Sequence, residues 1–345
     1  MQISMQVDYS GSFLRAVDQV VAYEKRGLDI AWVAEAYGFD SPTLMGYLAA
    51  KTDRVKIGAG IMPIYSRTPA LIAQTAAGLD EVSQGRAILG LGASGPQVIE
   101  GWHGVAYDQP IARTREIIHI CRSVWSRQPL VNDGIYRIPL PEGEGTGLGK
   151  PLKIITKPVR ENIPIYVASL GYKNVEMTFA TADGWLPIFY VPEKASDVWG
   201  KAIKAGLEKR DPGLGAPEIV GGGMLAIGKN VEHLRELGRG VLALYIGGMG
   251  AKGKNFYNDL AVRYGYGEQA NKIQDLYLSG EKARAMAEVP DELLEATSLI
   301  GPKGYVAERL AAYKESGITI LGVTPVGDDP LGSFDTLAEI VNQIG

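Results

Sequence analysis

Short runs of aliphatic residues recur along this chain, and each run is followed by a segment with helical periodicity. The runs are nearly continuously apolar, a pattern typical of parallel strands that helices cover. The segments between them repeat apolar residues at helical spacing, as in Phe13, Val17, Val20 and Val21. We interpret eight runs as strands: Ile3–Val7, Leu28–Val33, Val55–Ile61, Ala87–Leu91, Ile163–Ala168, Gly184–Ile188, Ile219–Ile227 and Ile318–Val323. Eight strands that alternate with helices predict an α/β fold, the (β/α)₈ barrel.

Two intervals are too long to be simple connections, and we predict insertions there. One, at about residues 127–162, comes after the fourth strand and is rich in proline and glycine, which favours a loop or a small hairpin. The other, at about residues 228–317, comes after the seventh strand, and we expect it to be mostly helical. With these insertions, we expect the 345 residues to form a single barrel domain.

Composition excludes several classes of protein. A formal net charge of −4 argues against non-specific binding to nucleic acid. The single cysteine, Cys121, excludes an intrachain disulfide framework, and no His/Asp/Glu set has metal-ligand spacing, so we expect no metal site. There is no apolar run of ~20 residues, and residues 1–4 lack the layout of a signal peptide. We therefore expect a cytoplasmic enzyme that does not span a membrane.

One stretch of the chain is recognisable. It runs without a gap from Ser66-Arg67-Thr68-Pro69, through Leu79-Asp80-Glu81-Val82-Ser83-Gln84-Gly85-Arg86, to Leu89-Gly90-Leu91-Gly92. It resembles the luciferase-like superfamily of barrel oxidoreductases, which share R-x-P, L-D-x-x-S-x-G-R and L-G-x-G at this spacing. Two cofactors occur in that superfamily, FMN and the deazaflavin coenzyme F420. Residues 55–69 resemble the F420 branch, especially methylenetetrahydromethanopterin reductase.

The resemblance implies a cofactor site on the loops that follow the strands, where barrel enzymes place their chemistry. A non-proline cis peptide at Gly60–Ile61 would support the deazaflavin ring, and Glu35 would lie near that ring. The phosphate would bind where Ser169, Leu170 and Gly171 open a helix, because free N–H groups and the helix dipole favour an anion there, and the Ser169 hydroxyl can add a hydrogen bond. The predicted cofactor-binding residues are Glu35, Gly60, Ile61, Ser94, Gly95, Gln97, Val98, Ala168, Ser169, Leu170, Gly171 and Pro187.

The catalytic groups are less well marked. Relatives that oxidise sugar phosphates carry histidine where this chain has Ala36, and no acid replaces the glutamate that some members place near Pro96. Asp8 and Tyr9, after the first strand, are the remaining candidates for proton transfer. A glycine-rich loop with Lys252 and Lys254 is either an anion-binding loop for the substrate or an ordinary exposed loop.

The sequence therefore predicts an F420-dependent oxidoreductase that passes a hydride between the cofactor and a small organic substrate, mainly as a reductase. The alternatives are an FMN-dependent monooxygenase and a barrel that binds deazaflavin without catalysis. Methylenetetrahydromethanopterin reductase itself is less favoured, because Gln6 stands near the place of that enzyme's glutamate. By family resemblance we also expect a homodimer.

Overall fold

The computed structural model describes residues 1–8 and 11–344. The strands of its main sheet are β1 (Gln2–Gln6), β2 (Ile30–Val33), β3 (Lys56–Ala59), β4 (Met62–Pro63), β5 (Ala87–Gly92), β8 (Ile165–Val167), β9 (Gly184–Trp185), β10 (Glu218–Ile227), β11 (Ser298–Gly301) and β12 (Ile320–Pro325). All strand pairs of this sheet are parallel within the described residues.

The sheet closes on itself. In the described part of the chain, β1, β2, β3, β5, β8, β9, β10 and β12 hydrogen-bond in that order, and β12 pairs with β1. The predicted (β/α)₈ barrel is therefore confirmed. Inside the barrel, Ile30, Trp32, Ile88, Tyr166, Val220 and Ile320 pack together from five strands, β2, β5, β8, β10 and β12, so the barrel is filled by side chains and has no pore.

Two strands of the main sheet were not predicted, the two-residue β4 and β11. β11 lies in the interval that we expected to be mostly helical, and it pairs with the second half of β10 through Met224–Ile227. The first half of β10 pairs with β9 instead. Gly222 lies between these two halves with φ of +149°, and a Cβ there would approach the Gly322 carbonyl oxygen to 2.0 Å, so only glycine fits.

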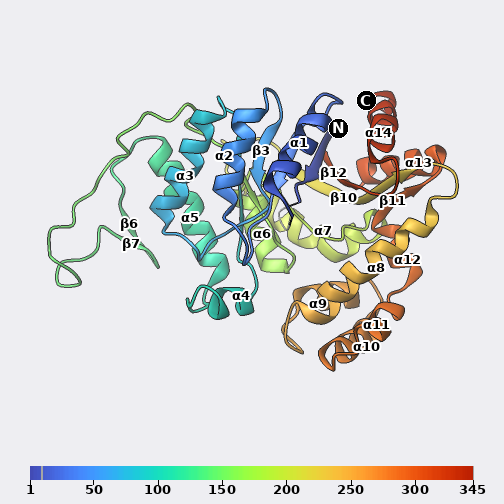
Figure 1. Cartoon of the computed structure of the whole chain (residues 1–345). Helices are drawn as coiled ribbons and strands as arrows, with labels where there is room; N and C mark the ends of the chain where they lie inside the picture. The colour runs from blue at the N-terminus through green and yellow to red at the C-terminus, as the bar shows by residue number, and fades with distance from the viewer. Residues whose placement is uncertain (9–10, 345) are drawn as a thin grey trace.

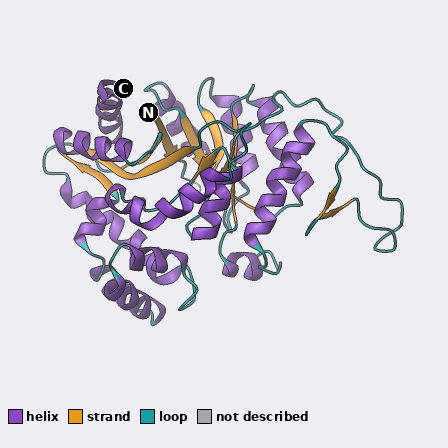
Figure 2. Cartoon of the chain, turned by 180° about the vertical axis from the view of Figure 1, so that it is seen from behind, coloured by secondary structure: helices purple, strands orange, loops and turns teal. Residues whose placement is uncertain are grey.

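Helices surround the barrel, as Figure 1 and the opposite view in Figure 2 show. They are α1 (Phe13–Glu24), α2 (Ser41–Lys51), α3 (Pro69–Val82), α4 (Pro96–Gly101), α5 (Pro110–Trp125), α6 (Tyr172–Thr181), α7 (Pro192–Glu208), α13 (Lys303–Glu315) and α14 (Pro330–Ile344). No helix among the described residues is both long and apolar enough to cross a membrane.

The two long intervals lie on opposite sides of the barrel (Figure 1). The first extends away from the body and holds a short hairpin, β6 (Asn132–Asp133) and β7 (Arg137–Ile138). The second forms a group of helices that we call the cap, residues 232–296. The cap consists of η1 (Glu232–Arg235), α8 (Glu236–Ala243), a π-helical turn η2 (Leu244–Gly248), α9 (Phe256–Arg263), α10 (Gly267–Leu278), α11 (Lys282–Ala287) and α12 (Asp291–Ala296).

Candidate active site

A cavity of about 1520 Å³ lies between the carboxyl ends of the barrel strands and the cap. Its barrel side is formed where strands end, as at Gln6, the last residue of β1, Gly60 after β3 and Leu186 after β9. Its opposite side comes from α8, η2 and the start of α9. Ligand cavities usually measure about 300–1,000 Å³, so this one has room for more than one small molecule.

Every predicted cofactor-binding residue lines this cavity: Glu35, Gly60, Ile61, Ser94, Gly95, Gln97, Val98, Ala168, Ser169, Leu170, Gly171 and Pro187. The peptide bond between Gly60 and Ile61 is cis, as the resemblance implies. Ile61 packs closely over the end of β5, where a Cβ on Gly92 would come within 2.7 Å of its side chain. The Ile61 carbonyl accepts a hydrogen bond from the Glu35 amide at 3.2 Å, so the loops after β2 and β3 are held together.

The loop after β8 turns its carbonyl groups away from the cavity. The Ser169 carbonyl accepts a hydrogen bond from the Trp185 indole at 2.9 Å. The Leu170 carbonyl accepts from the Trp199 indole at 3.0 Å and from the Arg263 guanidinium at 2.9 Å. In a trans peptide the N–H points opposite to the C=O, so the amides of Leu170 and Gly171 face the other way. Because both residues line the cavity, their N–H groups are placed to bind an anion at the N-terminus of α6.

The Ser169 side chain has a partner within the protein. Its hydroxyl lies 2.9 Å from the Thr178 hydroxyl, which also lies 2.8 Å from the Asn174 carbonyl and donates to it. Ser169 lines the cavity as well, and its predicted hydrogen bond to a phosphate stays a prediction. The contacts expected from the backbone amides of the loop do not depend on it.

Glu35 is also engaged by protein groups. Its two carboxylate oxygens pair with Arg67 at 2.6 and 3.1 Å, and one of them accepts from both the amide and the hydroxyl of Ser41. The Glu35 and Arg67 side chains are only 6% and 13% exposed. The carboxylate charge is therefore balanced within the protein, and one lone pair on Oε1 is left for a ligand.

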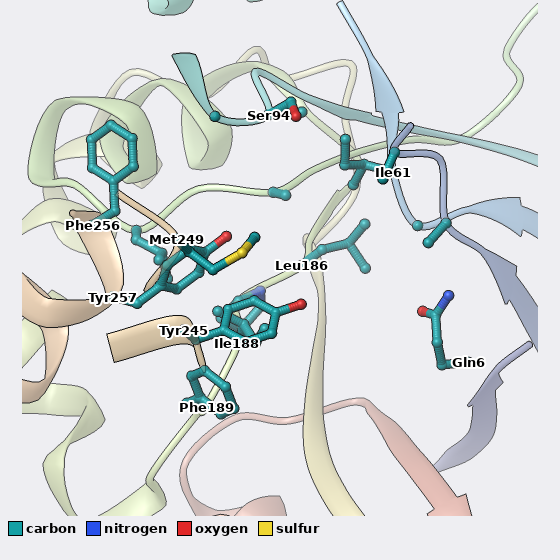
Figure 3. Close-up of a pocket in the computed structure, with 18 of the residues that line it drawn as sticks. Gln6, Ile61, Ser94, Leu186, Ile188, Phe189, Tyr245, Met249, Phe256 and Tyr257 are labelled. Carbon is teal, nitrogen blue, oxygen red and sulfur yellow. The ribbon is translucent and has the colours of Figure 1, made fainter. Parts of the chain in front are cut away.

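The cap contributes a wall that sequence reasoning missed. We call it the cap wall: Val241, Leu242, Leu244, Tyr245, Met249, Phe256, Tyr257 and Leu294. Figure 3 shows Tyr245, Met249, Phe256 and Tyr257 gathered on one side of the cavity, opposite Ile61, Leu186 and Gln6. Burial raises the pKa of Tyr257, and the neighbouring Tyr245 and Tyr107 raise it further. Its hydroxyl therefore stays protonated at neutral pH.

Buried asparagines hold the cap wall in place. Asn255 is 1% exposed; its side chain donates to the carbonyls of Tyr245 and Ile246 and accepts from the amides of Tyr257 and Asn258. It thus joins the π-helical turn to the start of α9. In the sequence, this arrangement is signalled by an asparagine at the N-cap position of α9. That signal marks the start of the helix but does not indicate where the helix lies relative to the barrel.

Charged groups are few in the cavity. Of its described lining residues, only Glu35 and Lys173 carry charge, and none is histidine. Lys173 lies in the first turn of α6, beside the amides of the β8 loop, and sequence reasoning overlooked it. The described residues contain no cluster of three or more His, Cys, Asp or Glu side chains that would bind a metal ion.

The other predicted site residues lie elsewhere. Asp8 is exposed, two residues after the end of β1, and accepts a hydrogen bond from the Gly11 amide. Gly11 lines the cavity, but Asp8 does not. Tyr9 lies outside the described residues. Lys252 and Lys254 are exposed and do not line the cavity; Lys252 forms an ion pair with Asp275 at 2.6 Å. That loop reaches the cavity through Met249 and Phe256 at its two ends.

Comparisons with known proteins fit this geometry. Residues 1–319 match the model of the luciferase-like monooxygenase family. The chain belongs to this family. It is thus an enzyme of the luciferase-like class, with the barrel and the carboxyl-end cavity described above.

Individual relatives of this luciferase-like enzyme give more detail. A protein of Mycobacterium tuberculosis named as a coenzyme F420-dependent oxidoreductase is 39% identical over 333 residues, which cover 94% of this chain and 95% of that protein. The 5,10-methylenetetrahydromethanopterin reductase of Archaeoglobus fulgidus is 27% identical over 93% of each chain. Among solved structures, the coenzyme F420-dependent tetrahydromethanopterin reductase of Methanopyrus kandleri matches with a TM-score of 0.81 and 20% identity over 99% of each chain.

Proposed function

We propose that this luciferase-like enzyme binds coenzyme F420 and transfers a hydride between it and a small organic molecule, mainly in the direction of substrate reduction. The observation that carries the proposal is the orientation of the β8 loop, whose Leu170 and Gly171 amides are directed to the side of the cavity. A phosphate bound there would also lie beside Lys173. The name of the Mycobacterium tuberculosis relative supports F420 as the cofactor.

The residues of the cavity fit this cofactor. The Leu170 and Gly171 amides would hold the phosphate, while Ile61 and the end of β5 would support one face of the ring. Trp32 lies inside the barrel next to Gly60, since a Cβ added to Gly60 would lie 3.0 Å from the Cβ of Trp32. When bound, the deazaflavin would supply hydride chemistry at one ring carbon, and the protein would supply its position and a weakly charged surrounding.

Proton transfer to a reduced substrate requires a donor in the cavity. Asp8 and Tyr9 remain our proposed groups for proton transfer because they come after β1 in the sequence, although Asp8 itself does not line the cavity. Tyr257 of the cap wall is a further proposed donor, since it lines the cavity and its hydroxyl remains protonated. Replacing Tyr257 by phenylalanine would then lower the reduction rate without changing cofactor affinity.

Fluorescence titration of the purified protein with F420 and with FMN tests the cofactor. We expect F420 to bind with clearly greater affinity, and equal or tighter binding of FMN would favour the monooxygenase alternative. If F420 binds but no acceptor among enones, imines, quinones and aldehydes oxidises its reduced form, the barrel is a carrier of deazaflavin and the catalytic part of the proposal is wrong.

A further inference from the structure

The cap wall is apolar and partly uncovered. Val241, Leu244, Met249 and Phe256 are 45%, 39%, 39% and 48% exposed, although each lines the cavity. Large apolar side chains that remain exposed inside a concave site mark the place where an apolar ligand binds, because its binding removes their surface from water.

Charge is absent from this part of the cavity. The two charged residues of the described lining lie elsewhere: Lys173 at the start of α6, and Glu35 in its pair with Arg67. A charged substrate seated against the cap wall would lose its hydration without gaining a partner, and that loss is large. The hydroxyl of Tyr257 is a polar group of the cap wall that suits a neutral oxygen or nitrogen atom.

The cavity also has room for a second molecule. Ile61 lies on the barrel side, whereas Tyr245, Met249, Phe256 and Tyr257 of the cap wall face it from the other side (Figure 3). A cofactor whose ring lies against Ile61 therefore leaves the cap wall free for the substrate.

We propose that the substrate is an uncharged molecule with a substantial hydrocarbon part, which lies against Val241, Leu244, Met249 and Phe256 with its polar, reducible group beside Tyr257. This inference rests on the proposed function, because it places the substrate in the space beside the cofactor. It excludes sugar phosphates and substrates with several carboxylates as good ligands of this enzyme.

The test measures binding without turnover. Isothermal titration calorimetry of the protein loaded with oxidised F420 compares 3-methyl-, 3-butyl- and 3-hexyl-2-cyclohexenone with the charged analogue 3-oxo-1-cyclohexene-1-carboxylate. We expect the dissociation constant to fall about twofold to fourfold for each added methylene. The carboxylate should bind at least about a hundredfold more weakly than the hexyl compound.

A pair of variants on α8 localises the effect. Leu237 is 54% exposed and does not line the cavity, whereas Val241, one turn later, does. Val241→Lys should weaken binding of 3-hexyl-2-cyclohexenone about tenfold, since it places a charge in the apolar wall, and should improve binding of the carboxylate. Leu237→Lys should change neither, and F420 affinity should be the same in both variants.

The outcomes separate this inference from the proposed function. If affinity does not depend on alkyl length, or if the carboxylate binds as tightly as the neutral compounds, the apolar substrate site is wrong even where F420 binds well. If F420 fails to bind, the same series with the cofactor-free protein still decides the question: a clear dependence on alkyl length supports the apolar site, although the proposed cofactor is wrong.

Discussion

Arg67 holds Glu35 at the edge of the cavity with two parallel hydrogen bonds, Nη1–Oε1 at 2.6 Å and Nη2–Oε2 at 3.1 Å. Glu35 follows β2 and Arg67 precedes α3, so the pair connects two loops at the carboxyl end of the barrel. The bidentate geometry fixes the Glu35 carboxylate, and the adjacent Ser41 bonds fix the start of α2.

Arg67→Met should destabilise the protein by about 3 kcal/mol, because it leaves the Glu35 carboxylate buried without its cation. Urea unfolding followed by circular dichroism measures this change. Glu35→Gln in the same background should recover part of the loss, since the remaining group is neutral. If the single variant is as stable as the unchanged protein, the pair contributes only to local position and not to folding.

Gly171→Val should weaken F420 binding at least about tenfold while the fold is kept. Gly171 has ordinary extended angles, and a Cβ there meets no atom within 4 Å, so the cost to folding is about 1 kcal/mol, that of a poor N-cap. The added methyl groups would occupy the space in front of the Leu170 and Gly171 amides. Fluorescence titration measures the affinity.

The matched control for this loop is Gly215→Val, at a position that is equally open but not part of the cavity. It should leave cofactor affinity unchanged. Normal binding by Gly171→Val would show that the phosphate lies elsewhere.

The barrel and the barrel side of the cavity could be predicted because both follow from local patterns. Continuous apolar runs mark buried parallel strands, and their ends mark the site; Gly60 and Gly171 were found in this way. β11 was missed because Ser298–Gly301 is too short to show a period and lies among helices. The direction of a side chain in a loop is not encoded by spacing, so the contacts of Lys252 with Asp275 and of Ser169 with Thr178 could not be predicted.

The cap wall could not be predicted for a different reason. Tyr245 lies in a π-helical turn and Tyr257 in the following helix, and neither belongs to a motif. Their place over the barrel depends on tertiary contacts, such as the bonds of Asn255, which no local pattern reveals.

Alkaline pH should destabilise the protein partly through Cys121. Burial raises the pKa of this thiol in the folded state, whereas in the unfolded chain it is about 8.5. Below that value both states keep the proton and the stabilising effect is fully present. Above it only the unfolded state loses the proton, so the free energy of unfolding falls by up to about 1.4 kcal/mol for each pH unit.

Cys121→Ala removes this contribution, so its stability between pH 8 and 10 should fall less steeply than that of the unchanged protein. Urea unfolding at each pH measures both slopes. Equal slopes would mean that the Cys121 thiol ionises as easily in the folded state as in the unfolded chain.

The proposed direction of hydride transfer, substrate reduction, depends on a residue that cannot accept a proton. Ala36 lines the cavity after β2, and no histidine is among the described lining residues. Oxidation of an alcohol needs a base for the hydroxyl proton as the hydride leaves, and such a base contributes about 10²–10⁴-fold in rate. Reduction of a polarised C=C or C=N bond needs only a proton donor, which a tyrosine or water supplies.

Steady-state assays in both directions should therefore show rapid oxidation of reduced F420 by enones and slow reduction of F420 by 2-propanol or glucose 6-phosphate. Ala36→His should raise the rate with 2-propanol and leave enone reduction nearly unchanged; rapid alcohol oxidation by the unchanged protein would show that another group acts as the base.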